Sequence, residues 1–111
     1  MAAVRAFAKQ GQDVNVAGAD GATALHWVVR AEDLETGAAL IDAGAAVSMP
    51  NAFGITPVYI AAESGNAALV RRLLDAGADV NTTDRTGDSL LMAAVRAGQI
   101  GAVQLLLDRG A

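Results

Sequence analysis

The sequence predicts an all-α solenoid of repeated helix-turn-helix units, and a regular spacing of glycines is the first observation that favours it. Gly21, Gly54 and Gly87 follow one another at intervals of 33 residues. A second series with the same interval consists of Gly11, Gly44, Gly77 and Gly110. An internal period of this length is typical of solenoids in which each repeat is one supersecondary unit.

The composition is the second observation. Apolar residues make up 53% of the 111 residues and aromatic residues only 4%, so much of the apolar content is alanine, which suits closely packed helices. Two prolines leave long stretches of the chain free to be helical. The length fits one small domain.

Each predicted repeat begins with a turn followed by a short first helix. The turns are expected at residues 18–22, 51–55 and 84–88. Thr23, Thr56 and Ser89 can satisfy free N–H groups at a helix start. Pro57 is tolerated in the first turn of a helix because its missing N–H costs nothing there. The first helices are therefore expected in "TALHWVVRA", "TPVYIAAES" and "SLLMAAVRA".

A second helix is predicted in each repeat after a break. Gly65 and Gly98 supply the positive φ that ends a helix at low cost. Glu32 stands at the equivalent position of the first repeat, where we expect a strained or differently built turn. The second helices are expected at residues 34–42, 67–75 and 100–108. Gly37 lies inside the first of these, costs about 0.5–1 kcal/mol relative to alanine, and is expected to leave thin packing.

These stretches resemble ankyrin repeats. The resemblance rests on "DRTG", on "GITPVYIAAESGNAALVRRLLDAGADVN" and on "DGATALH" followed by "LIDAGA", and it covers nearly the whole chain. It implies an all-α ankyrin-repeat solenoid whose helix-turn-helix units are joined by β-turn or hairpin loops. It divides the chain into a half repeat at 1–17, repeats at 18–50 and 51–83, and a truncated third repeat at 84–111. The content of Ala, Arg and Asp is similar to that of bacterial-type ankyrin proteins.

Charge and composition argue against several classes of protein. A net charge of −4 does not favour a nucleic-acid binder or a protein of anionic membrane surfaces. No apolar run approaches the ~20 residues that span a bilayer. Without cysteine and with one histidine, a zinc site is not expected, and we expect no metal and no cofactor. The N-terminal residues lack a complete signal peptide, and the compartment stays open.

The stretch "ALHWVVR" contains the only histidine and the only tryptophan of the chain. No serine or aspartate is spaced to form a catalytic triad with His26, so no enzyme activity is expected. The resemblance implies instead a local hydrogen-bonded pair of His26 with Thr23. Trp27 shares its repeat position with Ile60 and Ala93, which are also apolar, and we expect it to be buried between layers.

A repeat solenoid presents an extended concave surface to partners. We therefore expect a non-catalytic scaffold that binds a protein partner; the alternative is a structural or regulatory appendage of a larger multidomain protein. The resemblance places the contacts at the turn tips and near the ends of the first helices. At the turn tips the candidates are Asp20, Ala22, Phe53, Ile55, Arg85, Thr86 and Asp88, with Ala19 and Ala52 beside them. On the helices they are Arg30, Glu63, Ser64 and Arg96, with Ala31 and Ala97 beside them.

Two features of this surface have alternative interpretations. Phe53 and Ile55 are either exposed anchors for a partner or side chains folded against neighbouring turns. The repeat position that holds Arg30, Glu63 and Arg96 alternates in sign. It forms either a ladder of salt bridges between repeats, each worth little, or a charged stripe that complements a partner.

Aspartates occur at the same position near the end of each second helix, and they are candidates for a pair of carboxylates that share a proton. Asp42, Asp75 and Asp108 share one repeat position, with Lys9 at the equivalent place in the half repeat. Neighbouring helices lie about 8–10 Å apart, which is too far for a shared proton and indicates a solvated convex edge. Truncated ends would leave stacking surfaces uncovered, so end-to-end self-association is a further expectation.

Overall fold

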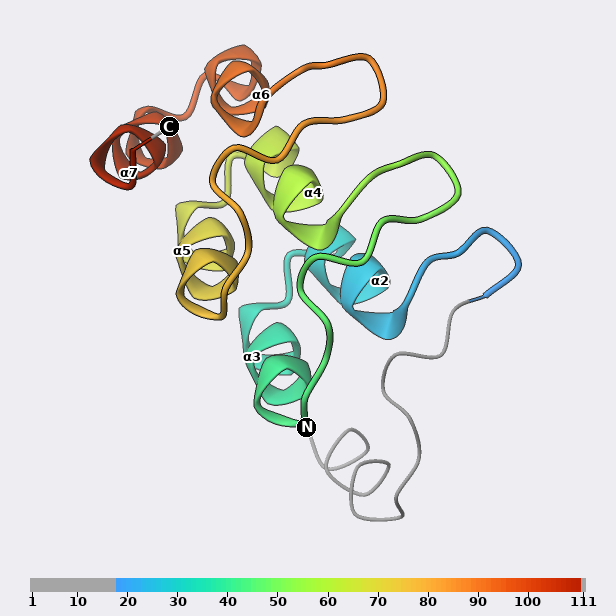
Figure 1. Ribbon diagram of the computed structural model, residues 1–111. Coiled ribbons are helices and arrows are strands. Elements are labelled where there is room, and N and C mark those ends of the chain that lie inside the picture. The colour runs from blue at the N-terminus through green and yellow to red at the C-terminus, as the bar shows by residue number, and fades with distance from the viewer. Residues whose placement is uncertain (1–17, 111) are drawn as a thin grey trace.

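The computed structural model describes residues 18–110, which form six helices in three successive pairs (Figure 1). The helices are α2 (Ala24–Arg30), α3 (Leu34–Asp42), α4 (Pro57–Ser64), α5 (Ala67–Asp75), α6 (Leu90–Ala97) and α7 (Ile100–Asp108). The second helix of each pair has the predicted bounds. The predicted half repeat at 1–17, with Lys9, lies outside the described residues.

The helices form two rows. The first helices α2, α4 and α6 contact one another in order, and the second helices α3, α5 and α7 do the same. The connecting loops extend from one side of the stack, as Figure 1 shows. The predicted all-α solenoid is therefore confirmed. Within residues 18–110, no helix has the length and apolar character needed to cross a membrane.

The helices α3, α5 and α6 begin after residues whose side chains accept from free backbone N–H groups. Asn66 Oδ1 accepts from the N–H of Leu69 at 3.1 Å, and Asp33 and Ser89 begin their helices in the same way. The side chain of Gln99 before α7 makes no such bond. Thr56 occupies the predicted position before α4, but its hydroxyl is buried without a hydrogen-bond partner, so the expectation that this side chain caps the helix is wrong.

The first helices end in a left-handed residue. Gly65 and Gly98 have φ of 72° and 73°. Glu32 takes the same conformation with φ of 57° and is the one non-glycine residue with positive φ in the described chain. A side chain in this region crowds the following carbonyl at a cost of roughly 1–2 kcal/mol. The predicted strain at Glu32 is confirmed.

The loops are tight hairpins. The N–H of Asn51 donates to the carbonyl of Ile55 at 2.9 Å, and the N–H of Asp84 donates to the carbonyl of Asp88 over the same distance. A β-bridge between Thr83 and Ser89 extends the third hairpin. The predicted β-turn and hairpin connections are therefore present.

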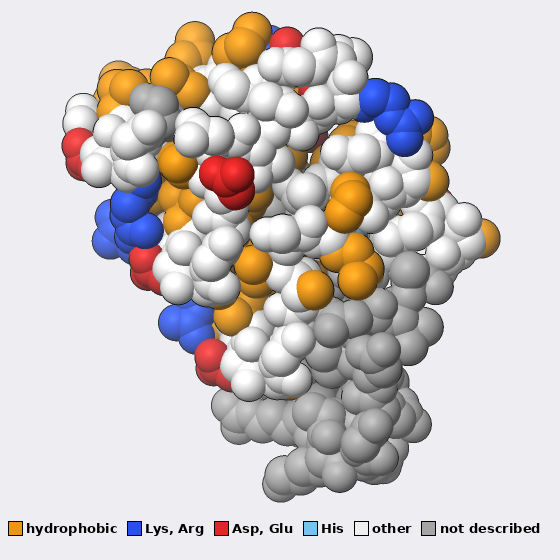
Figure 2. Space-filling model, viewed as in Figure 1, with side chains coloured by type: hydrophobic (Ala, Val, Ile, Leu, Met, Phe, Trp, Pro, Cys, Tyr) orange, Lys and Arg blue, Asp and Glu red, His pale blue; other side chains and the backbone are white. Residues whose placement is uncertain are grey.

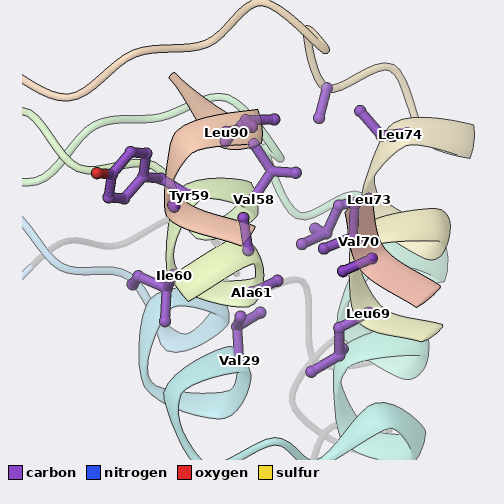
Figure 3. Close-up of a cluster of buried hydrophobic side chains, with 14 of the residues drawn as sticks. Val29, Val58, Tyr59, Ile60, Ala61, Leu69, Val70, Leu73, Leu74 and Leu90 are labelled. Carbon is purple, nitrogen blue, oxygen red and sulfur yellow. The ribbon is translucent and has the colours of Figure 1, made fainter. Parts of the chain in front are cut away.

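Buried aliphatic side chains from both rows fill the space between the pairs (Figure 3). Leu25, Leu69, Leu73 and Leu90 are fully buried, and burying each such side chain contributes about 1.5–3 kcal/mol. At Gly37 an added Cβ would lie 3.4 Å from Leu69 Cδ2. The packing beside Gly37 is therefore thinner by no more than one methyl group, because an added Cβ would already be in contact with its neighbours.

Candidate binding surface

The turn tips are held against one another along one edge of the stack. The N–H of Ala52 donates to the carbonyl of Asp20 at 2.7 Å, and the guanidinium of Arg85 donates to the carbonyl of Ala52. Gly21 permits this approach, since a Cβ at Gly21 would lie 2.9 Å from the Ala52 nitrogen. The three tips therefore form a continuous surface.

Each tip is also braced from within by a carbonyl or carboxylate oxygen. Asn51 Oδ1 accepts from the N–H groups of Phe53 and Ile55 at 2.9 and 3.1 Å. Asp84 occupies the equivalent position and accepts from the N–H groups of Thr86 and Asp88, both at 2.9 Å. Such side-chain bonds to the backbone two residues on are typical of tight turns. They fix the direction in which the exposed side chains of the tips point.

His26 connects the first repeat to the second. Its Nε2 lies 2.9 Å from the carbonyl oxygen of Ile55, and its Nδ1 lies 3.0 Å from both the backbone nitrogen and the hydroxyl of Thr23. Because a carbonyl can only accept, Nε2 carries the proton and Nδ1 accepts from Thr23. With both nitrogens bonded and the side chain 2% exposed, the structural interpretation of His26 is confirmed.

Tyr59 occupies the histidine position of the second repeat and connects to the third. Its hydroxyl donates to Asp84 Oδ2 at 3.2 Å. Burial, and secondarily the charge of Asp84, raise the pKa of Tyr59. The hydrogen bond from the Thr86 hydroxyl is the largest cause that lowers the pKa of Asp84. Sequence reasoning did not identify this connection, although Asp84 opens the "DRTG" turn.

A groove with a volume of about 320 Å³ lies between α2 and the second turn. It brings together five of the predicted partner-binding residues with three others. Its lining consists of Asp20, Ala22, His26, Trp27, Arg30, Asn51, Phe53 and Ile55. Ala22 is only 7% exposed and offers a partner little area.

The prediction that Trp27 is buried between layers is wrong, because this residue is 59% exposed. Ile60 and Ala93 at the same repeat position are each 3% exposed. They lie on α4 and α6, and each of these helices packs on the first helix before it. Figure 3 shows Ile60 directed toward α2. Within the described residues no helix precedes α2, and Trp27 forms a wall of the groove instead.

Phe53 and Ile55 differ: the first is exposed, as an anchor for a partner would be, and the second is folded against the neighbouring structure. Phe53 is 63% exposed at the tip of the turn. Ile55 is half-buried and packs against the core, and its carbonyl accepts from His26. Only Phe53 fits an exposed anchor, whereas Ile55 helps to hold the turn.

Of the two interpretations of Arg30, Glu63 and Arg96, the ladder of salt bridges between repeats is wrong. Arg96 Nη2 lies 2.6 Å from Asp88 Oδ2 in its own repeat, and this contact raises the pKa of Arg96. Arg30 and Glu63 take part in none of the ion pairs found among residues 18–110. Both side chains are exposed and available to a partner.

The remaining candidates contribute to the structure of the repeats. The guanidinium of Arg85 is bound to the neighbouring turn, and Thr86 donates its N–H and hydroxyl to Asp84. The hydroxyl of Ser64 donates to the carbonyl of Ile60 at 3.1 Å. Asp88 is half-buried and paired with Arg96. These side chains are less free than the sequence suggested.

Salt bridges between repeats occur on the second helices. Arg72 reaches back to Asp42 at 2.9 Å, and Arg109 reaches back to Asp75 at 2.6 Å. Figure 2 shows the resulting alternation of basic and acidic side chains along the left edge. The carboxylates are exposed, as expected of a solvated edge, but their arginine partners were not predicted.

A larger hollow of about 480 Å³ lies between α3 and α5. Its lining consists of Leu34, Ala67, Ala68, Arg71, Arg72 and Asp75. Arg72 and Asp75 already form salt bridges with other residues, so this hollow offers fewer free groups than the groove at Trp27. Among residues 18–110, no three His, Asp or Glu side chains are grouped to hold a metal ion.

The family model described as ankyrin repeats, in three copies, matches residues 25–111. A search of curated proteins found no match. The matched residues include α3 to α7, all of α2 except Ala24, and the two hairpins between the pairs.

Proposed function

Because the chain belongs to the ankyrin repeat family, we propose that it binds a protein partner through its turn tips and the concave face of its first helices. Ankyrin repeats are in general protein–protein interaction modules and typically non-catalytic. The observation that carries the proposal is the groove at α2, where two exposed aromatic side chains flank groups held in place by hydrogen bonds.

Trp27 and Phe53 are the proposed anchors. They are 59% and 63% exposed and lie on opposite elements of the groove. Aromatic side chains bury large areas on binding and are enriched among the residues that dominate interface energies. Asn51 and the turn-to-turn bond of Ala52 restrain the Phe53 backbone, so binding loses little conformational entropy there.

Arg30 and Glu63 are proposed to select the charge pattern of the partner. They share one repeat position and lie on neighbouring helices about 10 Å apart by typical helix spacing. A partner segment with a carboxylate near Arg30 and a cationic side chain near Glu63 would complement both. Complementary charges of this kind contribute to specificity and association rate more than to affinity.

The test is a pull-down with the wild-type protein and Phe53→Ser, followed by titration of the recovered partner. Trp27 is the only tryptophan of the chain, so its fluorescence reports occupancy of the groove when the partner segment lacks tryptophan. We expect Phe53→Ser to weaken binding at least about tenfold, as the loss of an interface hot spot does.

Leu34→Ser is the matched control, because Leu34 is exposed on the second row of helices away from the groove. Equal affinity of wild type and Phe53→Ser for every recovered partner would overturn the proposed anchor. The exchange Arg30→Glu with Glu63→Arg tests the charge pattern and is expected to slow association. The alternative, that these repeats are a structural or regulatory appendage of a larger protein, stays a prediction. The sequence that flanks these repeats in the full gene tests it.

A further inference from the structure

A small pocket opens between α4 and α6, which are neighbours in the first row of helices (Figure 1). We call it the α4–α6 pocket. It has a volume of about 190 Å³, and its lining consists of Glu63, Ala93, Arg96 and Ala97. Pockets that hold small-molecule ligands measure about 300–1,000 Å³. The α4–α6 pocket therefore suits a single side chain of a partner better than a separate small molecule.

The pocket lies within the stack of repeats and not at one of its ends. Ala93 is 3% exposed, because its side of α6 packs on α4. Glu63 is exposed although α6 already stacks on the helix that contains it. Arg96 occupies the same repeat position as Glu63, so a neighbour stacked on α6 would leave it accessible in the same way. The pocket is therefore a property of this junction between two repeats.

Two alanines give the pocket its apolar floor. Ala93 and Ala97 stand where the second repeat has the larger Ile60 and Ser64. The junction of α4 and α6 is therefore less filled at these positions than the junction of α2 and α4. Lysine and arginine bury their methylene stems along apolar surface and keep the charged head group in water. A floor of methyl groups with a charged rim suits such a side chain.

The charged groups of the pocket carry an excess of negative charge. Arg96 is compensated, since its Nη2 lies 2.6 Å from Asp88 Oδ2. Glu63 joins none of the ion pairs found among residues 18–110. The pKa of the neighbouring Tyr59 is raised first by burial and then by the charges of Asp84 and Glu63, whereas Arg96 lowers it. A cation is therefore the charge that the pocket lacks.

We propose that the α4–α6 pocket binds a lysine or arginine side chain of the protein partner. The methylene stem would lie on Ala93 and Ala97, and the cationic head group would face Glu63. The inference rests on the proposed function and deepens it, because it names the side chain that the partner inserts. An acidic side chain would meet the uncompensated carboxylate of Glu63, so the pocket selects against it. Complementary charge of this kind contributes to specificity more than to affinity.

The first experiment selects binders from a library of random peptides displayed on phage. Peptides recovered with the wild-type protein are expected to share a lysine or arginine at one position. Glu63→Arg is expected to replace this preference by one for aspartate or glutamate. Glu35→Arg is the matched control, because it makes the same change of charge at an exposed residue of α3, and it should keep the basic preference. Recovered peptides without a shared basic residue would overturn the proposal, as would a basic preference that survives Glu63→Arg.

The second experiment locates the basic side chain. A selected peptide is synthesised with lysine, arginine or norleucine at the shared position and titrated against the protein. Norleucine keeps the methylene stem without the charge and is expected to weaken binding about fivefold, the upper end for an ion pair at a protein surface. The tighter of the lysine and arginine peptides identifies the preferred head group. NMR should show saturable shifts of the Ala93 and Ala97 methyl groups, and saturation without these shifts would contradict the assignment.

Ala97→Leu fills the pocket without a change of charge. It is expected to weaken the lysine peptide at least to the affinity of the norleucine peptide. Ala31→Leu is the control, because Ala31 occupies the same repeat position in the first repeat, and it should leave the affinity unchanged. Urea unfolding of both variants verifies that they are folded. Wild-type affinity of folded Ala97→Leu would overturn the proposal.

Phe53→Ser separates this inference from the proposed function. It should weaken the selected peptides that reach the groove at Trp27 but leave their basic preference unchanged. Peptides that require Phe53 and show no basic preference would overturn the inference and leave the proposed function standing. Peptides that require Glu63 but bind Phe53→Ser as well as wild type would support the pocket and contradict the Phe53 anchor. If the wild type selected no peptide, both would be overturned.

Discussion

At the scale of single residues, Glu32 is the clearest site of strain. Its φ of 57° is a conformation that Gly65 and Gly98 take in the other repeats without a side chain. We expect Glu32→Gly to raise the free energy of unfolding by about 1 kcal/mol, because the relief of crowding exceeds the added flexibility of the unfolded chain. Urea denaturation measures the change. Glu32→Ala is the control, since it removes the charge and keeps the strain, and equal stabilisation by both variants would contradict this account.

His26 provides the second prediction at this scale. Replacement by alanine leaves the buried N–H of Thr23 without its acceptor and removes one of the two hydrogen bonds that the carbonyl of Ile55 accepts. We expect His26→Ala to lower the free energy of unfolding by about 1–3 kcal/mol, the usual cost of unsatisfied buried groups. Thermal and urea unfolding measure it. His26→Gln is the control that can restore part of the bonding, and an unchanged unfolding curve for His26→Ala would contradict the structural role.

At the scale of elements, the third turn depends on the ionised form of Asp84. The hydrogen bonds that Asp84 accepts lower its pKa, so its carboxylate takes up a proton less readily in the folded protein than in the unfolded chain. The stabilisation is present above the ordinary aspartate pKa near 3.9 and is lost as the pH falls through the lower value of the folded state. Stability of the wild type should therefore fall below about pH 4 more steeply than that of Asp84→Asn.

Measurement of urea midpoints of both proteins between about pH 5 and pH 2.5 tests this dependence. Asp42→Asn is a useful comparison, because Asp42 is exposed and lies outside the turn. Parallel pH profiles for wild type and Asp84→Asn would show that the carboxylate of Asp84 does not stabilise the turn.

The elements themselves could be predicted because period and local chemistry agree. The interval of 33 residues places the turns, and helix-starting residues and glycines set the helix ends, so the three second helices were predicted to the residue. The exposure of Trp27 could not be predicted in this way. Its repeat position is apolar in every copy, but exposure depends on whether a helix precedes it in space. The partner of Arg96 was missed for a similar reason, since Asp88 lies in a loop whose path the period does not specify.

At the scale of the whole molecule, the helix pairs within residues 18–110 pack mainly on the adjacent pairs. In such a solenoid, stability is close to a sum of repeat and neighbour contributions. Leu73 and Leu106 share a repeat position and are both fully buried. Leu73 lies in the central repeat, between two neighbouring pairs, whereas Leu106 lies in the last described pair.

We expect Leu73→Ala to cost about 2–5 kcal/mol and to destabilise all three pairs. Leu106→Ala should instead accelerate hydrogen exchange mainly in α6 and α7, because the other pairs keep their contacts. Hydrogen exchange of both variants, followed residue by residue, distinguishes the two responses. Uniform loss of protection in Leu106→Ala would indicate a single cooperative unit.

The bonds of His26 and Tyr59 have a consequence for the order of the repeats. His26 donates to a backbone carbonyl, which every amino acid possesses, so the repeat that contains it can precede any copy with the same hairpin. Tyr59 donates to the carboxylate of Asp84, which only the third copy provides, since the first two have Gly18 and Asn51 at that position. A shuffled gene could therefore place a different repeat after the first one, whereas the second repeat keeps its bond to a carboxylate only when a turn that begins with an acidic residue comes after it.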